Sequence, residues 1–205
     1  MGTGTVHSSS KYTSIASCTI NTSSRYKTMQ KPVRVAFAGC MASGKSFAAQ
    51  HLKKRLPFAK ILSLATAVKN MVRGNPMFDN RQGYQLVGSV GRQIDPEAWV
   101  KILSNEIAEM DIRHSIIVDD VRFENELIAL RNLGFTIIYM DTPWHLRLQR
   151  VRDRLAAKNR NPSFIEFVGW FTHESETQLG RLPKNIFDKV FVEPEEMIKY
   201  IDNTY

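Results

Sequence analysis

Residues 39–46 read Gly-Cys-Met-Ala-Ser-Gly-Lys-Ser and match the pattern G-x-x-x-x-G-K-[ST]. Glycines in such a loop let backbone N–H groups turn toward phosphate oxygens, and the helix that follows adds a favourable dipole. Lys45 is expected to neutralise the β- and γ-phosphates of ATP, and Ser46 to ligate Mg²⁺. Contacts to the nucleotide are predicted for Gly39, Ala42, Ser43, Gly44, Lys45, Ser46 and Phe47.

A pair of carboxylates ends a second apolar run, Ser-Ile-Ile-Val-Asp-Asp-Val at 115–121. We expect Asp120 near the magnesium ion and Arg122 near a transferred or acceptor phosphate. Alternatively, Asp119 or Asp120 caps the next helix and Arg122 pairs with Glu126. Motor-type ATPases carry a water-activating Glu after this Asp, but Asp120 is followed by valine. An acceptor other than water is therefore favoured.

The segment 144–154 predicts a helix with arginines along one face. Arginines on a mobile lid can stabilise charge that develops on the phosphate oxygens during transfer. Arg150 and Arg154 are predicted to close over the phosphates in this way, on a lid of about residues 144–165. A solvated basic helix face is the alternative.

The elements that must position these residues follow from the apolar pattern. Strands alternating with helices predict an α/β fold with a doubly wound parallel sheet and ligand sites at the C-terminal ends of its strands. The predicted strands cover 33–38, 60–64, 115–118, 135–140 and 187–192. The predicted helices cover 46–56, 66–72, 93–109, 124–133 and 145–158, with a short helix at the C-terminus.

Residues 1–31 are rich in Ser and Thr and contain no acidic residue, which is typical of a disordered leader before a catalytic domain over 32–205. An organelle transit peptide is an alternative, although Arg25 is the only arginine in this leader. Met29 is an alternative start. The sequence has no run of about 18 apolar residues, and Cys18 and Cys40 lack disulfide or metal spacing. These features predict a cytoplasmic protein.

The formal net charge of +8 is unevenly distributed. Residues 1–78 hold 12 Lys or Arg and no acid, whereas 79–205 hold 16 basic and 20 acidic residues. A phosphate site, a polyanion-binding surface and an ordinary basic surface would all give this asymmetry. We find no nucleic-acid-binding motif, so nucleic acid is not an expected partner.

Together with the phosphate loop, several further stretches resemble the deoxynucleoside monophosphate (dNMP) kinases of bacteriophages and large DNA viruses. The resemblance runs from about residue 33 to 192 and leaves out the leader. It rests on Gln85-Leu86-Val87-Gly88, Gly91-Arg92, Trp99, Asp120-Val121-Arg122-Phe123, Asn125-Glu126, His173-x-Ser175-Glu176 and Phe187-Asp188-x-Val190.

The resemblance implies a P-loop fold of the nucleoside-monophosphate-kinase type, with an acceptor-binding segment at about 65–110 and the lid. It implies that dNMP is converted to dNDP with ATP and Mg²⁺. Apart from the resemblance, a homodimer is one assembly that the sequence leaves open. Lys69 and Arg92 would hold the acceptor phosphate, joined by Arg122 and Glu176, and Trp99 would wall its site. From its helical spacing alone, Trp99 is instead expected in the core.

Two other functions remain open from the sequence. Phosphomevalonate kinases of the animal type share the phosphate loop and an Asp-Val-Arg segment, so the acceptor is less well defined than the donor. A P-loop regulatory or nucleic-acid-associated ATPase is an alternative from another class.

Overall fold

The computed structural model describes residues 1–2, 31–56 and 58–205, and the predicted leader lies almost wholly outside them. Residues Lys31–Tyr205 form a compact unit of their own. Among the described residues, no helix is both long and apolar enough to cross a membrane.

The centre of this unit is a parallel sheet of five strands in the order β2-β3-β1-β4-β5. Strand β1 lies in the middle, with Val35 paired to Ile117 of β3 on one side and to Thr136 of β4 on the other. The predicted parallel α/β sheet is thus confirmed. The strands are β1 (Arg34–Gly39), β2 (Lys60–Leu62), β3 (Ile116–Val121), β4 (Thr136–Met140) and β5 (Lys189–Phe191).

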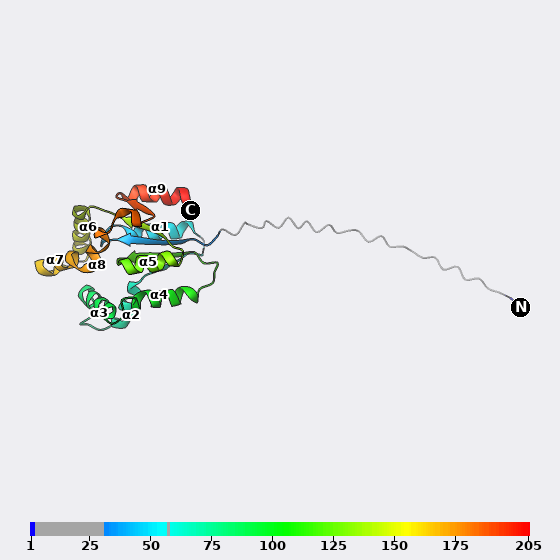
Figure 1. The fold of residues 1–205 in the computed structure, drawn as a ribbon, viewed down its shortest axis with the longest axis horizontal. Helices are drawn as coiled ribbons and strands as arrows, with labels where there is room; N and C mark the ends of the chain where they lie inside the picture. Colours follow the sequence, from blue (N-terminus) through cyan, green and yellow to red (C-terminus); the bar gives the residue numbers. More distant parts are fainter. Residues whose placement is uncertain (3–30, 57) are drawn as a thin grey trace. The chain divides into compact units, whose positions relative to one another are not determined.

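Helices cover both faces of the sheet (Figure 1). The longer ones are α1 (Lys45–Arg55), α2 (Ala65–Val72), α3 (Arg81–Ile94), α4 (Ala98–Ala108), α5 (Glu124–Asn132), α6 (Trp144–Ala156), α7 (Phe164–Thr172) and α9 (Pro194–Thr204). Short helical turns follow α7 at α8 (Glu174–Thr177), Leu179–Arg181 and Lys184–Ile186.

Alternation along β1 divides the core into two layers, because successive strand side chains point to opposite faces. Val35 and Phe37 pack with α1 and α9, whereas Ala36 and Ala38 pack with residues of α2, α4 and α5. All four are fully buried. Burial on both faces explains why the sequence of β1 is continuously apolar rather than alternating.

The structure differs from the predicted helices between the second and third strands. In place of one helix at 93–109 it has α3 and α4, separated at Asp95. Helix α3 holds three glycines, which lower its intrinsic helix propensity. For this reason its sequence does not predict a helix. Tertiary packing offsets that loss, since Gly91 lies directly against the ring of Trp99. Helix α7 was not predicted either.

Candidate active site

The phosphate loop connects β1 to α1 at the C-terminal edge of the sheet. Gly39 has a φ of 140°, and a Cβ there would lie 2.8 Å from the carbonyl oxygen of Met140, so only glycine fits. Gly44 precedes α1 with a φ of 106°, a conformation that glycine adopts without strain. The first turn of α1 leaves its backbone N–H groups without intrahelical partners, and these are available to an anion.

Lys45 is buried within this loop, with 5% of its surface exposed. Its Nζ donates hydrogen bonds to the carbonyl oxygen of Cys40 at 2.6 Å and to Ser43 Oγ at 3.4 Å. Burial, and next the positive charge of Arg122, lowers the pKa of Lys45 to about 7. An anionic ligand in the loop would restore a favourable environment for the ammonium charge.

The carboxylate beside Ser46 is Asp119, not Asp120. Ser46 Oγ donates to Asp119 Oδ2 at 3.1 Å, and the other oxygen of Asp119 is buried with no partner among the described residues. Burial, followed by the nearby charge of Asp120, raises the pKa of Asp119. A cation would relieve this penalty on the ionised carboxylate.

Asp120 instead holds the start of α2. Its carboxylate accepts hydrogen bonds from Ser63 Oγ at 2.7 Å and from the backbone N–H groups of Leu64 at 2.8 Å and Ala65 at 3.0 Å. The side chain in contact with Ser46 is thus Asp119, and the predicted place of Asp120 near the magnesium ion stays a prediction. The alternative of a helix cap holds, although the helix is α2 across the sheet and not the following α5.

A cavity of about 250 Å³ opens beside Ser46 and Asp119 and extends toward α2, α3 and α8. Four basic side chains face it, contributed by Lys69, Arg81, Arg92 and Arg122. Asp120, Glu126, His173 and Glu176 complete much of its polar lining. The cavity therefore joins a carboxylate–hydroxyl pair at one side to a cluster of cations at the other.

Glu176 lies between the phosphate loop and two of these arginines. Its Oε2 accepts from the backbone N–H of Met41, and its Oε1 accepts from Arg81 Nη2 at 3.0 Å and from Arg122 Nη1. Arg81 was not predicted from the sequence. Without the fold, it is one basic residue among many at the start of an unrecognised helix.

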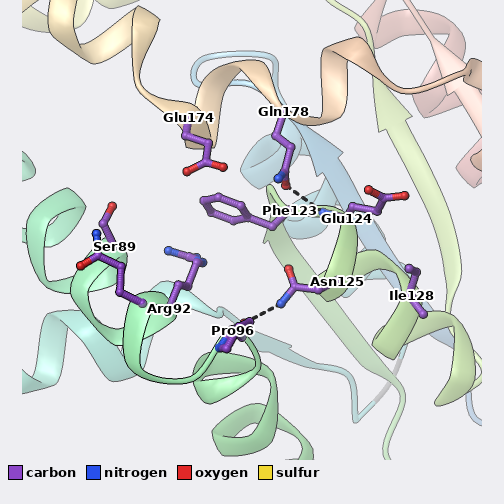
Figure 2. A pocket seen from close by; sticks show the side chains of 10 residues that line it. Ser89, Arg92, Pro96, Phe123, Glu124, Asn125, Ile128, Glu174 and Gln178 are labelled. Atoms are coloured by element: carbon purple, nitrogen blue, oxygen red, sulfur yellow. Dashed lines mark hydrogen bonds between the residues drawn. The ribbon is translucent and has the colours of Figure 1, made fainter.

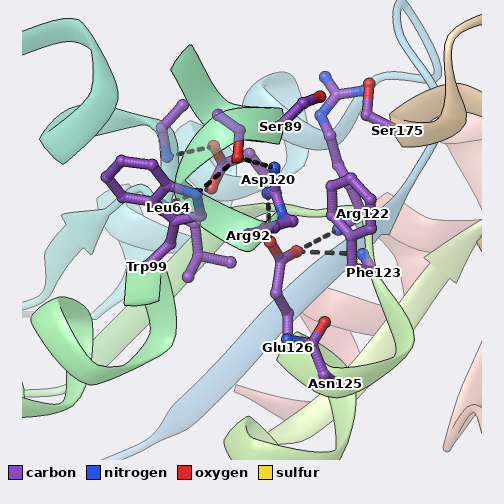
Figure 3. A network of polar contacts seen from close by, with 12 residues as sticks. Leu64, Ser89, Arg92, Trp99, Asp120, Arg122, Phe123, Asn125, Glu126 and Ser175 are labelled. Carbon is purple, nitrogen blue, oxygen red and sulfur yellow. Dashed lines mark hydrogen bonds and ion pairs between the residues drawn. The ribbon is translucent and has the colours of Figure 1, made fainter. Parts of the chain in front are cut away.

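Glu126 fixes the remaining arginine, as Figure 3 shows. This glutamate is 1% exposed, and its Oε1 accepts from Arg92 Nη2 at 2.9 Å. Its Oε2 accepts from the backbone N–H groups of Arg122 at 2.8 Å and Phe123 at 3.0 Å. Arg92 also lies over the Phe123 ring, 3.6 Å from the centroid. One buried carboxylate thus orients Arg92 and the backbone that carries Arg122.

The other predicted site residues lie at the margin of the cavity or outside it. Trp99 is buried behind α3, where its Nε1 donates to the carbonyl oxygen of Gly88 at 3.0 Å, in agreement with the expected core position. Arg150 Nη1 donates to the carbonyl oxygen of Ala42 at 3.1 Å and so reaches the rim of the phosphate loop. Arg154 is exposed farther along α6, and Phe47 is 61% exposed on α1.

A second, larger cavity of about 500 Å³ lies on the other side of Arg92 and Phe123 (Figure 2). Asn125 Nδ2 donates to the carbonyl oxygen of Pro96 at its edge, at 2.6 Å. The acidic side chains of Glu124 and Glu174 face this cavity, and among the residues that the structure describes Arg92 is the one basic residue in its lining. The smaller cavity, which reaches the phosphate loop and holds four basic residues, is the better candidate for phosphate chemistry.

The family model of an AAA domain, AAA_18, matches residues 35–167, from the first strand through the start of α7. The chain belongs to this family. The AAA domain match includes the phosphate loop, both aspartates and helix α6.

Two curated relatives of this AAA domain come from Ictalurid herpesvirus 1 (strain Auburn). Uncharacterized protein ORF77 is 29% identical over 120 residues, which are 56% of this chain and 53% of the relative. Uncharacterized protein ORF76 is 24% identical over 115 residues, 53% of this chain and 48% of the relative. The chain spans about half the length of the curated relatives it matches.

Solved structures with the same fold include shikimate kinase from Acinetobacter baumannii in complex with shikimate. It has a TM-score of 0.54 at 14% identity, covering 85% of this chain and 92% of that chain. A candidate kinase from Chloroflexus aurantiacus has a TM-score of 0.53 at 18% identity, covering 85% and 94%. At these identities the likeness concerns the fold, which is the α/β P-loop NTPase fold found in small-molecule kinases.

Proposed function

We propose that this chain is a small-molecule kinase that transfers the terminal phosphoryl group of ATP to the phosphate of a deoxynucleoside monophosphate. The observation that carries the proposal is the cavity that joins Ser46 and Asp119 to the cluster of Lys69, Arg81 and Arg122. The first pair suits a magnesium-bound donor phosphate, and the cluster suits an anionic acceptor.

On the donor side, Lys45 and the backbone N–H groups of the loop would hold the ATP phosphates. The Ser46 hydroxyl and the Asp119 carboxylate would hold Mg²⁺, which prefers oxygen ligands. Their fit to the ion rests on the 3.1 Å contact between them and on the unpartnered Asp119 Oδ1. When bound, Mg²⁺ would neutralise charge on the transferred group.

On the acceptor side, Arg81 and Arg122 present guanidinium groups that can bind phosphate oxygens through two N–H donors each. Lys69 adds a positive charge at the rim of the same cavity. Arg92 is already held by Glu126 and Phe123, so its part is to complete the positive potential of the wall.

Phosphoryl transfer between two phosphates requires no covalent intermediate with the protein. A phosphate monoester is mostly dianionic at neutral pH, since its second pKa is about 6, so its oxygen attacks without a general base. Positioning in line with the leaving group and neutralisation of charge supply most of the acceleration. Arg150, at the rim of the loop, would approach the transferred group when the lid closes.

The nature of the acceptor rests on the resemblance to viral dNMP kinases and on the charge of the cavity. A phosphomevalonate-type acceptor carries the same phosphate and would use the same arginines. An ATPase would leave the arginines of the cavity without an anion to bind, so this alternative ranks below both kinases.

The test is a coupled assay of ADP release from Mg-ATP with a panel of dNMPs, NMPs and mevalonate 5-phosphate. The proposal expects at least one dNMP to accelerate ADP release at least roughly tenfold over water alone. If mevalonate 5-phosphate alone accelerates ADP release, the proposed donor site stands and the proposed dNMP acceptor is wrong. Release that no acceptor accelerates would favour the ATPase.

A further inference from the structure

The side chain of Glu176 has 0% of its surface exposed and joins two halves of the site. One oxygen accepts from the backbone N–H of Met41 in the phosphate loop, and the other accepts from Arg81 and Arg122. The donor loop and the two cavity arginines are therefore connected through a single carboxylate.

The backbone of Glu176 is tied to the same loop. Its carbonyl oxygen accepts from Cys40 Sγ at 3.1 Å, next to the side-chain contact at Met41. The short helix α8 that carries Glu176 is capped by His173, whose Nδ1 accepts from the backbone N–H of Ser175 at 3.2 Å. These contacts fix the position of the carboxylate relative to the loop.

The charges explain what this arrangement achieves. A buried carboxylate is costly to desolvate, and two guanidinium groups with a backbone N–H offset that cost. Two arginines around one carboxylate keep a net positive charge for a ligand, and the carboxylate offsets part of the repulsion between them. They stand ready before an anion arrives, which lowers the entropic cost of binding it.

We propose that Glu176 is a positioning residue, which fastens Arg81 and Arg122 to the phosphate loop at the spacing that a phosphorylated acceptor requires. The inference rests on the proposed function, because it assigns these two arginines to the acceptor phosphate. Without the carboxylate, the two guanidinium groups repel each other and turn toward solvent, and acceptor binding suffers before ATP binding does.

The first experiment compares Glu176→Gln with Glu174→Gln, a matched change at an exposed glutamate of the same short helix. Separate KM values are measured for ATP and for the best phosphorylated acceptor, together with the thermal midpoint. We expect Glu176→Gln to raise the acceptor KM roughly 10- to 100-fold, and the ATP KM less than about threefold. Glu174→Gln should change neither. Equal losses for both substrates, or an unchanged acceptor KM, would overturn the inference.

A second variant keeps the inference testable if Glu176→Gln does not fold. Arg81→Lys leaves the carboxylate and its loop contact in place but removes the planar fork of donors. It should raise the acceptor KM alone. Where both variants fold, their combination should be no worse than Glu176→Gln, because residues of one network are not additive. Fully additive losses would contradict the proposed coupling.

A failure of the proposed kinase function can be told apart from a failure of the inference about Glu176. A wild-type chain that transfers phosphate to no acceptor refutes that function, and the inference is then judged with inorganic phosphate as the probe. Phosphate should raise the thermal midpoint of the wild type and of Glu174→Gln, and much less that of Glu176→Gln. No protection of the wild type, or equal protection of Glu176→Gln, would overturn the inference.

Discussion

The hydroxyl of Ser46 donates a hydrogen bond to the carboxylate of Asp119 at 3.1 Å, although the two residues lie 73 positions apart. They meet because β1 and β3 are adjacent parallel strands whose C-terminal ends share one edge of the sheet. A hydroxyl and a carboxylate at this distance, beside a phosphate loop, form the magnesium half of the proposed donor site.

This relationship predicts different effects for the two neighbouring aspartates. Asp119→Asn should lower kcat roughly 10²- to 10³-fold and raise the Mg²⁺ concentration needed for half-maximal rate, because it weakens an ionic ligand. Its thermal midpoint should change little. A titration of the rate with Mg²⁺ measures the effect.

Asp120→Asn is the contrasting variant, since its carboxylate accepts three hydrogen bonds at the start of α2. We expect a loss of about 1–2 kcal/mol in the free energy of unfolding, as for loss of a helix cap, with the Mg²⁺ requirement unchanged. A shifted Mg²⁺ requirement in Asp120→Asn, and none in Asp119→Asn, would return the metal role to Asp120.

Lys45→Met should reduce phosphoryl transfer by roughly 10³-fold while the fold persists. In the absence of nucleotide the variant should be as stable as the wild type or more so, because burial disfavours the charge of this lysine. Thermal unfolding with and without ATP provides the check, and stabilisation by ATP should be lost. Near-normal turnover would refute the donor assignment.

Two glycine variants test the packing behind the cavity. A Cβ at Gly91 would lie within 3.0 Å of two ring carbons of Trp99, so Gly91→Ala should lower the free energy of unfolding by about 1–3 kcal/mol. Gly169→Ala in α7 is the matched control, since a Cβ there meets no atom within 4 Å. Urea unfolding should show a gain of about 0.5–1 kcal/mol for this variant.

Arg92→Met should destabilise the protein in a pH-dependent way. Burial raises the pKa of Glu126 above its ordinary value, and Arg92 acts against that rise. Without Arg92 the pKa of Glu126 in the folded state would rise further above its value in the unfolded state. The free energy of unfolding of Arg92→Met should therefore fall as pH rises above about 4.3, the ordinary pKa of glutamate.

Urea unfolding of wild type and Arg92→Met at about pH 5 and about pH 7 measures this effect. The deficit of the variant should be larger at the higher pH. A deficit that is independent of pH would mean that Arg92 acts through its packing on Phe123 alone.

The sequence predicts the phosphate loop and its flanking elements well, because this loop has a local pattern. The glycine spacing, the apolar strand and the following helix lie within about twenty residues, and they fold as expected. The three inner strands β1, β3 and β4 follow from apolar runs, because strands buried on both faces need them.

The rest of the candidate site depends on contacts between distant residues, which a single sequence does not reveal. Choosing between Asp119 and Asp120 required the register of β3 against β1 and β2. Arg81 is recognised as a candidate site residue only through its contact with Glu176, 95 positions away in the sequence. Helix α3 was missed because its glycines are suited to close packing rather than to local helix formation.

The most direct test of the central claim follows a label from the γ-phosphate of ATP through a single turnover with a dNMP. The proposed mechanism predicts that the label appears on the β-phosphate of a dNDP, and that Arg122→Met slows this transfer without increasing free labelled phosphate. Label found only as inorganic phosphate, whatever acceptor is present, would contradict it.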